Sequence, residues 1–167
     1  MKKILLMIIL AAIMLVLLVS CNPPIEKDEM EEIFTENYEL MMIVVNYFKN
    51  SGHERIGIRD GDERGQIRVG GGHIAETGDI EFIEAVETLR KRGFRNPTRS
   101  GNTIRFLRWS RPNVGHGIAY SINGLDPIEA EIWHLTRLEP LSVPNWFYYE
   151  SDFNEWRRQN PRPPLGE

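Results

Sequence analysis

Apolar residues in the first half of the chain recur at the spacing of an amphipathic helix. Six of them are three or four positions apart, which places them on one face of a helix. Asp28 followed by Glu31 is typical of a helix start, and Ser51-Gly52 is typical of a helix end. The pattern therefore predicts a long helix over residues 29–50. Its apolar face comprises Met30, Phe34, Tyr38, Met41, Val45 and Phe48.

A second stretch with helical spacing lies near the middle of the chain. Its first turn is acidic and its last turn is basic, as the helix dipole favours, and Gly93 follows as a stop. We predict a helix over residues 79–92. The apolar residues on its shared face are Phe82, Ile83, Val86 and Leu89.

Two short segments between these helices have the composition of strands. Residues 55–59 and 66–69 are rich in residues that favour strands, and turn-forming residues 60–65 join them. We therefore predict a β-hairpin. The three glycines at positions 70–72 then allow the chain to bend or to approach another segment closely.

Three further strands are expected after a turn at residues 96–102. Asn123-Gly124 favours a hairpin between the last two of them. A short helix or turn is expected over residues 151–158. The predicted strands are residues 103–109, 117–122 and 129–138.

The predicted elements follow the order αββαβββ. The simplest assembly is an α+β fold in which two helices pack on one face of an antiparallel sheet of about five strands. Residues 29–158 then form a single domain. Residues 159–167 are rich in proline, and we expect them to form a flexible tail.

The N-terminus has the organisation of a secretory signal peptide. Two lysines at positions 2 and 3 precede the uncharged residues 4–19. As a helix, sixteen residues span about 24 Å, which is less than the ~30 Å hydrocarbon core of a bilayer. Pro23 and Pro24 would stop a helix from continuing. We therefore expect residues 1–20 to be removed; the alternative is an uncleaved signal anchor.

The apolar run ends in Leu18-Val19-Ser20-Cys21, which resembles the lipobox of bacterial lipoproteins. The resemblance implies cleavage between Ser20 and Cys21 and a covalent diacylglyceryl lipid on the Cys21 thiol. Two acyl chains give a stable membrane anchor, whereas one binds only marginally. Residues 21–28 would then form a lipidated tether.

The lipobox also implies a location for the protein. It places the protein on the extracytoplasmic face of the cell membrane. Asn22 stands where an Asp would mark retention in the inner membrane of many Gram-negative lipoproteins. In a Gram-negative cell we would therefore expect the outer membrane.

Charge is distributed unevenly along the chain. Residues 21–167 carry 18 basic against 24 acidic side chains, a balance that argues against a general nucleic-acid binder. Residues 90–111, however, contain eight basic residues and no acidic one. This segment could bind an anionic partner such as lipid headgroups, a wall polymer or an acidic protein face. The candidate binding residues are Arg90, Arg92, Arg95 and Arg99.

The basic segment also has a purely structural interpretation. Arg90 and Arg92 lie at the end of the predicted helix, where cations complement the helix dipole. Arg105 and Arg108 would point to opposite faces of a strand, so the charges cannot all share one surface.

The aromatic run over residues 146–149 has two interpretations. Trp146 and Tyr148 are candidates for a recognition surface, since Trp and Tyr are typical interface anchors. Alternatively, the run packs the C-terminal segment onto the sheet and its rings form part of the core.

The sequence offers little support for catalysis or metal binding. The four histidines have no pair at the helical spacing of a zinc motif, which leaves only a site assembled from distant segments, and we expect no metal site. His73 and His116, which lie in glycine-rich segments, are the weak candidates for a catalytic site. Cys21 is the only cysteine, which excludes an intramolecular disulfide and a zinc cluster containing cysteine. Apart from the lipid on Cys21, no cofactor is expected.

Residues 102–157 resemble small uncharacterised lipoproteins of Gram-positive-type bacteria. The resemblance rests on Thr103-Ile104-Arg105-Phe106, on Gly117-Ile118-Ala119-Tyr120-Ser121 and on Leu138-Glu139-Pro140-Leu141 with the aromatic run. It implies the location only. The leading hypothesis is a non-enzymatic binding module for a protein or an envelope polymer. The alternatives are a small envelope hydrolase with a dispersed His/Asp/Glu site and a structural envelope lipoprotein.

Overall fold

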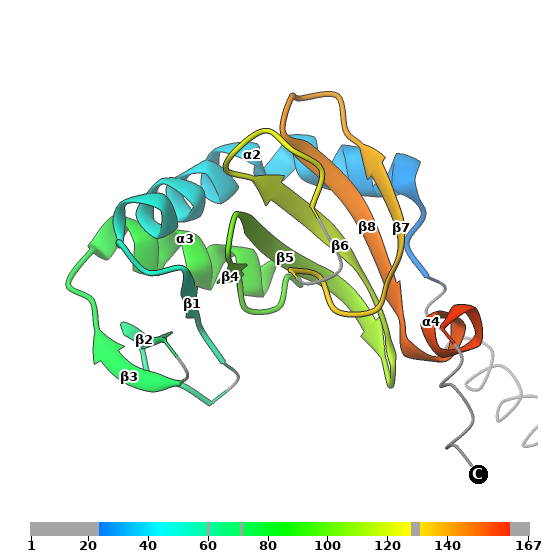
Figure 1. Ribbon diagram of the computed structural model, residues 1–167. Helices are drawn as coiled ribbons and strands as arrows, with labels where there is room; N and C mark the ends of the chain where they lie inside the picture. The colour runs from blue at the N-terminus through cyan, green and yellow to red at the C-terminus, as the bar shows by residue number, and fades with distance from the viewer. Residues whose placement is uncertain (1–23, 60, 71, 128–130, 161–167) are drawn as a thin grey trace, which may run out of the picture.

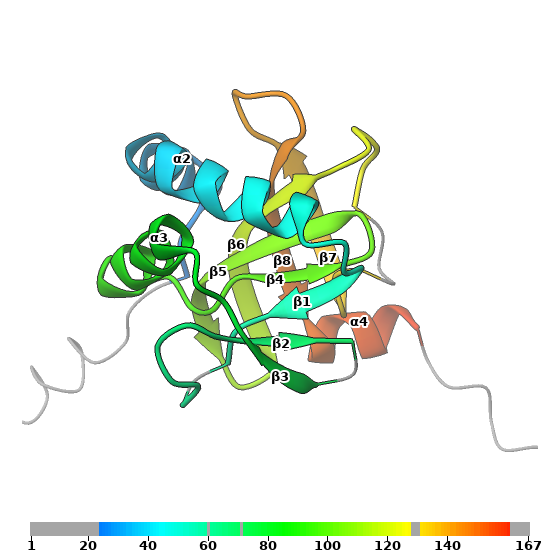
Figure 2. The same cartoon turned by 90° about the vertical axis from the view of Figure 1, so that its left-hand side faces the viewer.

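The computed structural model describes residues 24–59, 61–70, 72–127 and 131–160. Its strands form one antiparallel sheet in the order β3-β2-β1-β4-β5-β6-β8-β7 (Figures 1 and 2). Ser20 and Cys21 lie outside the described residues. The elements are α2 (Lys27–Asn50), β1 (Arg55–Gly57), β2 (Gln66–Val69), β3 (His73–Glu76), α3 (Ile80–Lys91), β4 (Thr98–Ser100), β5 (Thr103–Arg111), β6 (Val114–Ser121), β7 (Leu135–Pro140), β8 (Trp146–Asp152) and α4 (Phe153–Gln159).

The α+β class is confirmed, but the prediction of about five strands is wrong, because the sheet has eight. Strands β3 and β4 have four and three residues, which is too short for an alternating pattern to emerge from the sequence. Strand β8 was not among the predicted strands for a different reason. Its first four residues are all buried, so the strand shows no alternation between apolar and polar residues.

The predicted hairpin around Asn123-Gly124 is also wrong. Strand β6 pairs with β5 and β8, whereas β7 pairs with β8 alone. The Ser121 hydroxyl donates to Asn123 Oδ1 at 2.9 Å, and Leu125 N donates to the same oxygen at 3.1 Å. These bonds form a local turn at the end of β6, and β8 takes the position beside that strand.

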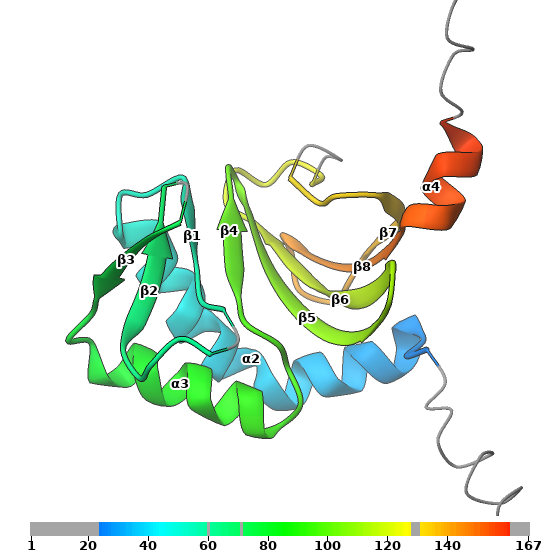
Figure 3. The same cartoon turned by 90° about the horizontal axis from the view of Figure 1, so that it is seen from below.

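Helices α2 and α3 pack side by side against one face of the sheet (Figures 1 and 3). Helix α2 begins at Lys27, inside the predicted tether, and Asp28 lies in its first turn rather than capping it. Helix α3 is capped by Asp79, whose side chain accepts a hydrogen bond from Phe82 N at 2.9 Å. The helices and the sheet enclose the main core. Buried residues in it include Met30, Phe34, Val45, Phe48, Phe82, Leu89, Ile104, Phe106, Ile118 and Trp146.

Strands β5, β6, β8 and β7 curve strongly, with α2 on their convex side (Figure 3). Irregularities in pairing between Leu107 and Trp109 and between Leu135 and Arg137 fall in this part of the sheet. Bulges of this kind bend a strand and increase its twist. Of the described helices, only α4 borders the opposite, concave face, at the edge formed by β7 and β8 (Figure 3).

The central strand β6 has small residues on its concave side. His116 and Ile118 point toward the helices, so Gly115 and Gly117 face the other way. A Cβ atom on Gly117 would lie only 2.4 Å from the Phe106 carbonyl oxygen. A second, small core of Ala119, Ile132, Phe147 and Tyr149 occupies one part of this face.

All buried apolar residues of the described chain lie between Ile25 and Tyr149. A chain that begins at residue 21 therefore contains every buried apolar residue that the structure describes.

Candidate functional site

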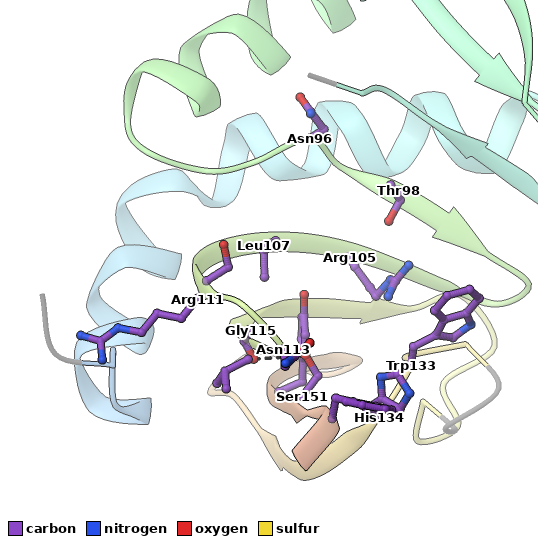
Figure 4. Close-up of a pocket in the computed structure, with 14 residues that line it drawn as sticks. Asn96, Thr98, Arg105, Leu107, Arg111, Asn113, Gly115, Trp133, His134 and Ser151 are labelled. Carbon is purple, nitrogen blue, oxygen red and sulfur yellow. Dashed lines mark hydrogen bonds between the residues drawn. The ribbon is translucent and has the colours of Figure 1, made fainter. Parts of the chain in front are cut away.

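A groove runs along the concave face of the sheet. It consists of two pockets, of about 610 Å³ and 380 Å³, which share Thr98, Arg105 and Trp133. We call these two pockets together the concave groove. Each volume falls in the range of roughly 300–1,000 Å³ that is typical of ligand pockets. Figure 4 shows the larger pocket, which lies over β5, β6 and β8.

The concave groove is positively charged in a protein whose formal net charge is −4. Among the described residues that line it, Glu131 is the only acidic one. Its carboxylate is already bound, because it accepts hydrogen bonds from Asn102 N and from the Thr103 hydroxyl. The arginines that face the groove are Arg55, Arg59, Arg68 and Arg105. Arg99 and Arg111 also lie on its border, but the Arg99 guanidinium donates to Phe48 on α2, and the Arg111 guanidinium extends away from the pocket over the Trp109 ring (Figure 4).

Two of these arginines have well-defined partners within the protein. Arg68 binds Asp62 through two of its nitrogens, at 2.6 and 3.0 Å, and this hydrogen bonding lowers the pKa of Asp62. Arg99 donates to the carbonyl oxygens of Phe48 and Gly101 at 2.8 and 2.9 Å. The bond to Phe48 at the end of α2 places the Arg99 guanidinium on the helix side of the sheet, so its charge does not enter the groove.

Arg105 differs from both, because it forms no ion pair with any described residue. Its Nε atom is buried and has no hydrogen-bond partner. A buried donor without a partner costs about 1–3 kcal/mol, and more if it is charged. Tyr149 lies nearby; burial raises the pKa of its hydroxyl, and the Arg105 cation opposes that rise. Arg105 is therefore the residue of the groove that most clearly lacks an anion.

The groove also has an aromatic wall. Trp133 is 74% exposed, the largest exposed fraction among the big apolar side chains of the described chain. The neighbouring His134 ring lies between Phe153 and Trp156, with centroid distances of 4.8 and 5.0 Å. The His134 carbonyl oxygen also accepts a hydrogen bond from Asp152 N at 3.0 Å. Trp133 is therefore exposed next to a backbone segment that is fixed in place.

None of the four candidate arginines presents its guanidinium to the concave groove; Arg99 borders the groove, but its guanidinium donates to Phe48 on the helix side of the sheet. Arg92 donates to the carbonyl oxygen of Glu36 and to Asn37 Oδ1, so it ties α3 to α2. Arg90 donates to Asn96 Oδ1 and to the Arg59 carbonyl oxygen. Arg95 is exposed outside the groove. The four residues therefore do not form one binding surface.

Trp146 and Tyr148 do not form an exposed recognition surface, because they are 1% and 0% exposed on the helix side of the sheet. The Trp146 ring packs against Phe34 and Phe106, with centroid distances of 5.0 and 5.9 Å. The interpretation of the aromatic run as part of the core therefore holds for these two residues.

His73 and His116 are not brought together. His73 is exposed on the edge strand β3, whereas His116 is buried on β6, and four strands of the sheet lie between them. The prediction of a hydrolytic site that combines these two histidines is therefore wrong. Within the described ranges, no group of three His, Cys, Asp or Glu residues is arranged to hold a metal ion.

His116 belongs instead to a polar cluster that fixes the start of the described chain. Its Nδ1 atom lies 3.0 Å from the Ile25 carbonyl oxygen and 2.8 Å from the Tyr148 hydroxyl. The Tyr148 hydroxyl also lies 2.8 Å from Glu150 Oε1. Burial, followed by this contact with Glu150, raises the pKa of Tyr148. Ile25 is thereby fastened to β6 and β8.

Ion pairs extend this cluster to the next residues of the chain. Arg137 donates to Glu139 at 2.6 Å and to Glu150 at 2.8 Å, and its hydrogen bond lowers the pKa of Glu139. Lys27 lies 3.5 Å from Glu139. The start of α2 is therefore attached to β7 and β8.

Sequence reasoning missed two residues of the groove, Arg105 and Trp133. The alternation of Ile104, Arg105 and Phe106 already indicates that Arg105 faces away from the core. No comparable signal marks Trp133, which lies in a segment predicted as a strand.

No helix among the described residues has both the length and the apolar character needed to cross a membrane. Comparison with known proteins gives no match to a family model, a curated protein or a solved structure.

Proposed function

We propose that this chain is a membrane-anchored lipoprotein whose extracytoplasmic domain is a non-enzymatic binding module for an anionic envelope ligand, held in the concave groove. The observation that carries the proposal is Arg105, a cation with a buried, unpartnered donor in a groove lined by further arginines. An anionic ligand would supply the missing acceptor and compensate the charge.

The lining of the groove favours binding over hydrolysis. General acid–base catalysis requires a titratable group that can reach the substrate. The Glu131 carboxylate accepts hydrogen bonds from Asn102 and Thr103, and the His134 ring, which lines the larger pocket, packs edge-on against two aromatic rings rather than against a carboxylate that would orient it.

The hydrogen bonds that attach Ile25 to β6 and β8 support the proposal that the domain stays close to the membrane. Cys21 lies four residues before Ile25, and four residues of backbone span at most about 14 Å. If Cys21 carries the lipid, Ile25 and the sheet to which it is bonded stay within that distance of the anchor. A ligand in the layer next to the membrane, such as an envelope polymer, suits this geometry.

Binding to isolated cell envelopes tests the proposed function. The chain from residue 21 with Cys21→Ser would be incubated with envelopes stripped of protein, and the bound fraction measured at increasing salt. We expect binding that weakens with salt and is lost in Arg105→Gln. Arg64→Gln is the matched control, because it removes a charge paired with Glu87 outside the groove. Equal binding by both variants would contradict the proposal.

Metabolic labelling with a fatty acid tests the anchor separately. The full-length chain should incorporate label and sediment with membranes, and Cys21→Ala should do neither. Labelling of the alanine variant would show that Cys21 is not the lipidated residue.

A further inference from the structure

Trp133 and Arg105 form a pair at the centre of the concave groove. Both side chains line both of its pockets, and Figure 4 shows them next to each other. One offers an exposed flat aromatic face and the other a guanidinium with a buried, unpartnered Nε. A ligand that uses both must combine a flat apolar face with an anionic group close to it.

We infer that the ligand is an acidic saccharide chain, in which one sugar ring stacks on Trp133 and the acidic group of that ring or the next binds Arg105. This inference rests on the proposed function and specifies the chemistry of its ligand. The C–H face of a sugar ring is apolar and carries a weak positive charge, which matches the electron-rich face of an indole. A carboxylate matches the planar donor fork of a guanidinium.

The remaining lining residues suit a ligand rich in hydroxyl groups. Thr98, Ser110 and Ser151 contribute hydroxyls to the larger pocket, and Asn113 contributes an amide. Such groups both donate and accept hydrogen bonds, as sugar hydroxyls do. The two pockets on either side of the Trp133–Arg105 pair allow the chain to continue in both directions.

An extended acidic peptide fits this surface less well. Peptides that bind to sheets usually add a strand to a free edge and bond to its backbone. The concave groove lies on a face of the sheet, where β5, β6 and β8 are already paired with one another. The floor of the groove therefore has no free strand edge to offer a peptide.

Calorimetry with a matched set of probes tests this inference. The chain from residue 21 with Cys21→Ser would be titrated with a hexamer of galacturonic acid, its methyl ester and hexaglutamate. The first probe has rings and charge, the second has rings only and the third has charge only. A hexadeoxynucleotide, which combines flat bases with anionic phosphates, tests a nucleic acid as the other ligand class. We expect the galacturonate hexamer to bind at least about tenfold more tightly than its methyl ester and hexaglutamate, because each of these two probes meets only one group of the pair. We expect the oligonucleotide to bind more weakly than the galacturonate hexamer as well.

Variants of the pair complete the test. Arg105→Gln and Trp133→Ala should each weaken binding of the galacturonate hexamer about tenfold or more, while Trp133→Phe, which keeps an aromatic face, should retain most of the affinity. Arg108→Gln, on the other face of β5, should bind normally. Far-ultraviolet circular dichroism would confirm that each variant is folded.

The outcomes separate this inference from the proposed function. If hexaglutamate or the oligonucleotide binds as tightly as the galacturonate hexamer, the saccharide is overturned, but an anion-binding groove stands. If no probe binds while envelopes still bind the protein through Arg105, the assignment of an acidic saccharide as the ligand is again overturned, and the proposed function stands. If both variants of the pair bind the galacturonate hexamer like wild type, the assigned site is wrong.

Discussion

The two faces of the curved sheet differ in almost every physical respect. The convex face meets α2 and α3 through large apolar side chains such as Phe106, Ile118 and Trp146, all of them buried. The concave face has glycines on its central strand and arginines along its length. Neighbouring residues of one strand thus have different roles, because they lie on opposite faces of the sheet. The main core lies on the convex face, and the concave face outside the small second core is open to a ligand.

The contrast is sharpest within β5. Ile104 and Phe106 are 0% exposed in the core, whereas Arg105 between them has a buried donor without a partner. Arg108 on the other face of β5 also has a buried Nε without a partner, but its Nη1 donates to the Gly93 carbonyl oxygen, whereas the Arg105 guanidinium has no hydrogen-bond acceptor among the described residues. Such an unsatisfied charged donor costs stability. Functional sites are where such local costs are expected.

The largest expected effect is the difference between two tryptophans. Trp146→Ala removes a ring from the centre of the core and should lower the free energy of unfolding by about 3–5 kcal/mol. Trp133→Ala removes an exposed ring and should change it by less than about 0.5 kcal/mol. Urea unfolding of both variants measures the two values. Similar losses would show that Trp133 is a structural residue.

Two glycines of β6 should give the next largest effect. In Gly117→Ala the new Cβ would meet the Phe106 carbonyl oxygen at 2.4 Å, so we expect a loss of about 1–3 kcal/mol of stability. In Gly115→Ala it would meet side-chain atoms of Leu107 and Ser151 at 3.0 and 3.1 Å, which can move. The loss should then be smaller, while the methyl group narrows the groove. Thermal unfolding ranks the two variants, and the reverse order would contradict this description of the strand.

The concave face should also contribute to the pH dependence of stability. Burial raises the pKa of Tyr149, so above pH ~10 the unfolded chain loses this proton while the folded chain retains it. Stability is therefore fully present below that pH and falls as the pH rises. Tyr149→Phe should make the fall shallower, by at most about 1.4 kcal/mol per pH unit. Urea unfolding at a series of alkaline pH values gives the slopes; equal slopes in wild type and variant would refute the contribution.

The smallest expected effect is at Arg105. Because its Nε atom has no partner, Arg105→Met should leave the free energy of unfolding within about 0.5 kcal/mol of wild type, or raise it. Arg92→Met should lower it by about 1–2 kcal/mol, since Arg92 donates to two acceptors on α2. Chemical unfolding of both variants compares them. A larger loss at Arg105 would mean that this residue supports the fold.

The helices could be predicted because their pattern is local. Apolar spacing and end signals mark α2 and α3 within a few residues of their bounds. Strand β5 could also be predicted from a local pattern, because the alternation of Ile104, Arg105 and Phe106 places Arg105 on the face that points away from the core. Strand β8 could not be recognised, because burial on both faces removes alternation.

The candidate site was less predictable, since it depends on residues far apart in the chain. Arg105 and Trp133 lie on different segments, and only the fold brings them into one groove. The basic segment at residues 90–111 looks continuous in sequence, but Arg92 and Arg99 both donate to α2, whereas Arg105 faces the groove. Charge counted along a sequence cannot tell these positions apart.

Photocrosslinking in living cells tests the binding role of the concave face most directly. A photoreactive derivative of phenylalanine, which keeps an aromatic ring, would replace Trp133 in the full-length chain and, as a control, Ile80, which is 61% exposed at the start of α3 on the other side of the sheet. We predict an envelope-polymer adduct at position 133 that disappears in Arg105→Gln, and none at position 80. An adduct at position 80 alone, or one at position 133 that persists in Arg105→Gln, would contradict the assignment of the concave groove as the binding site.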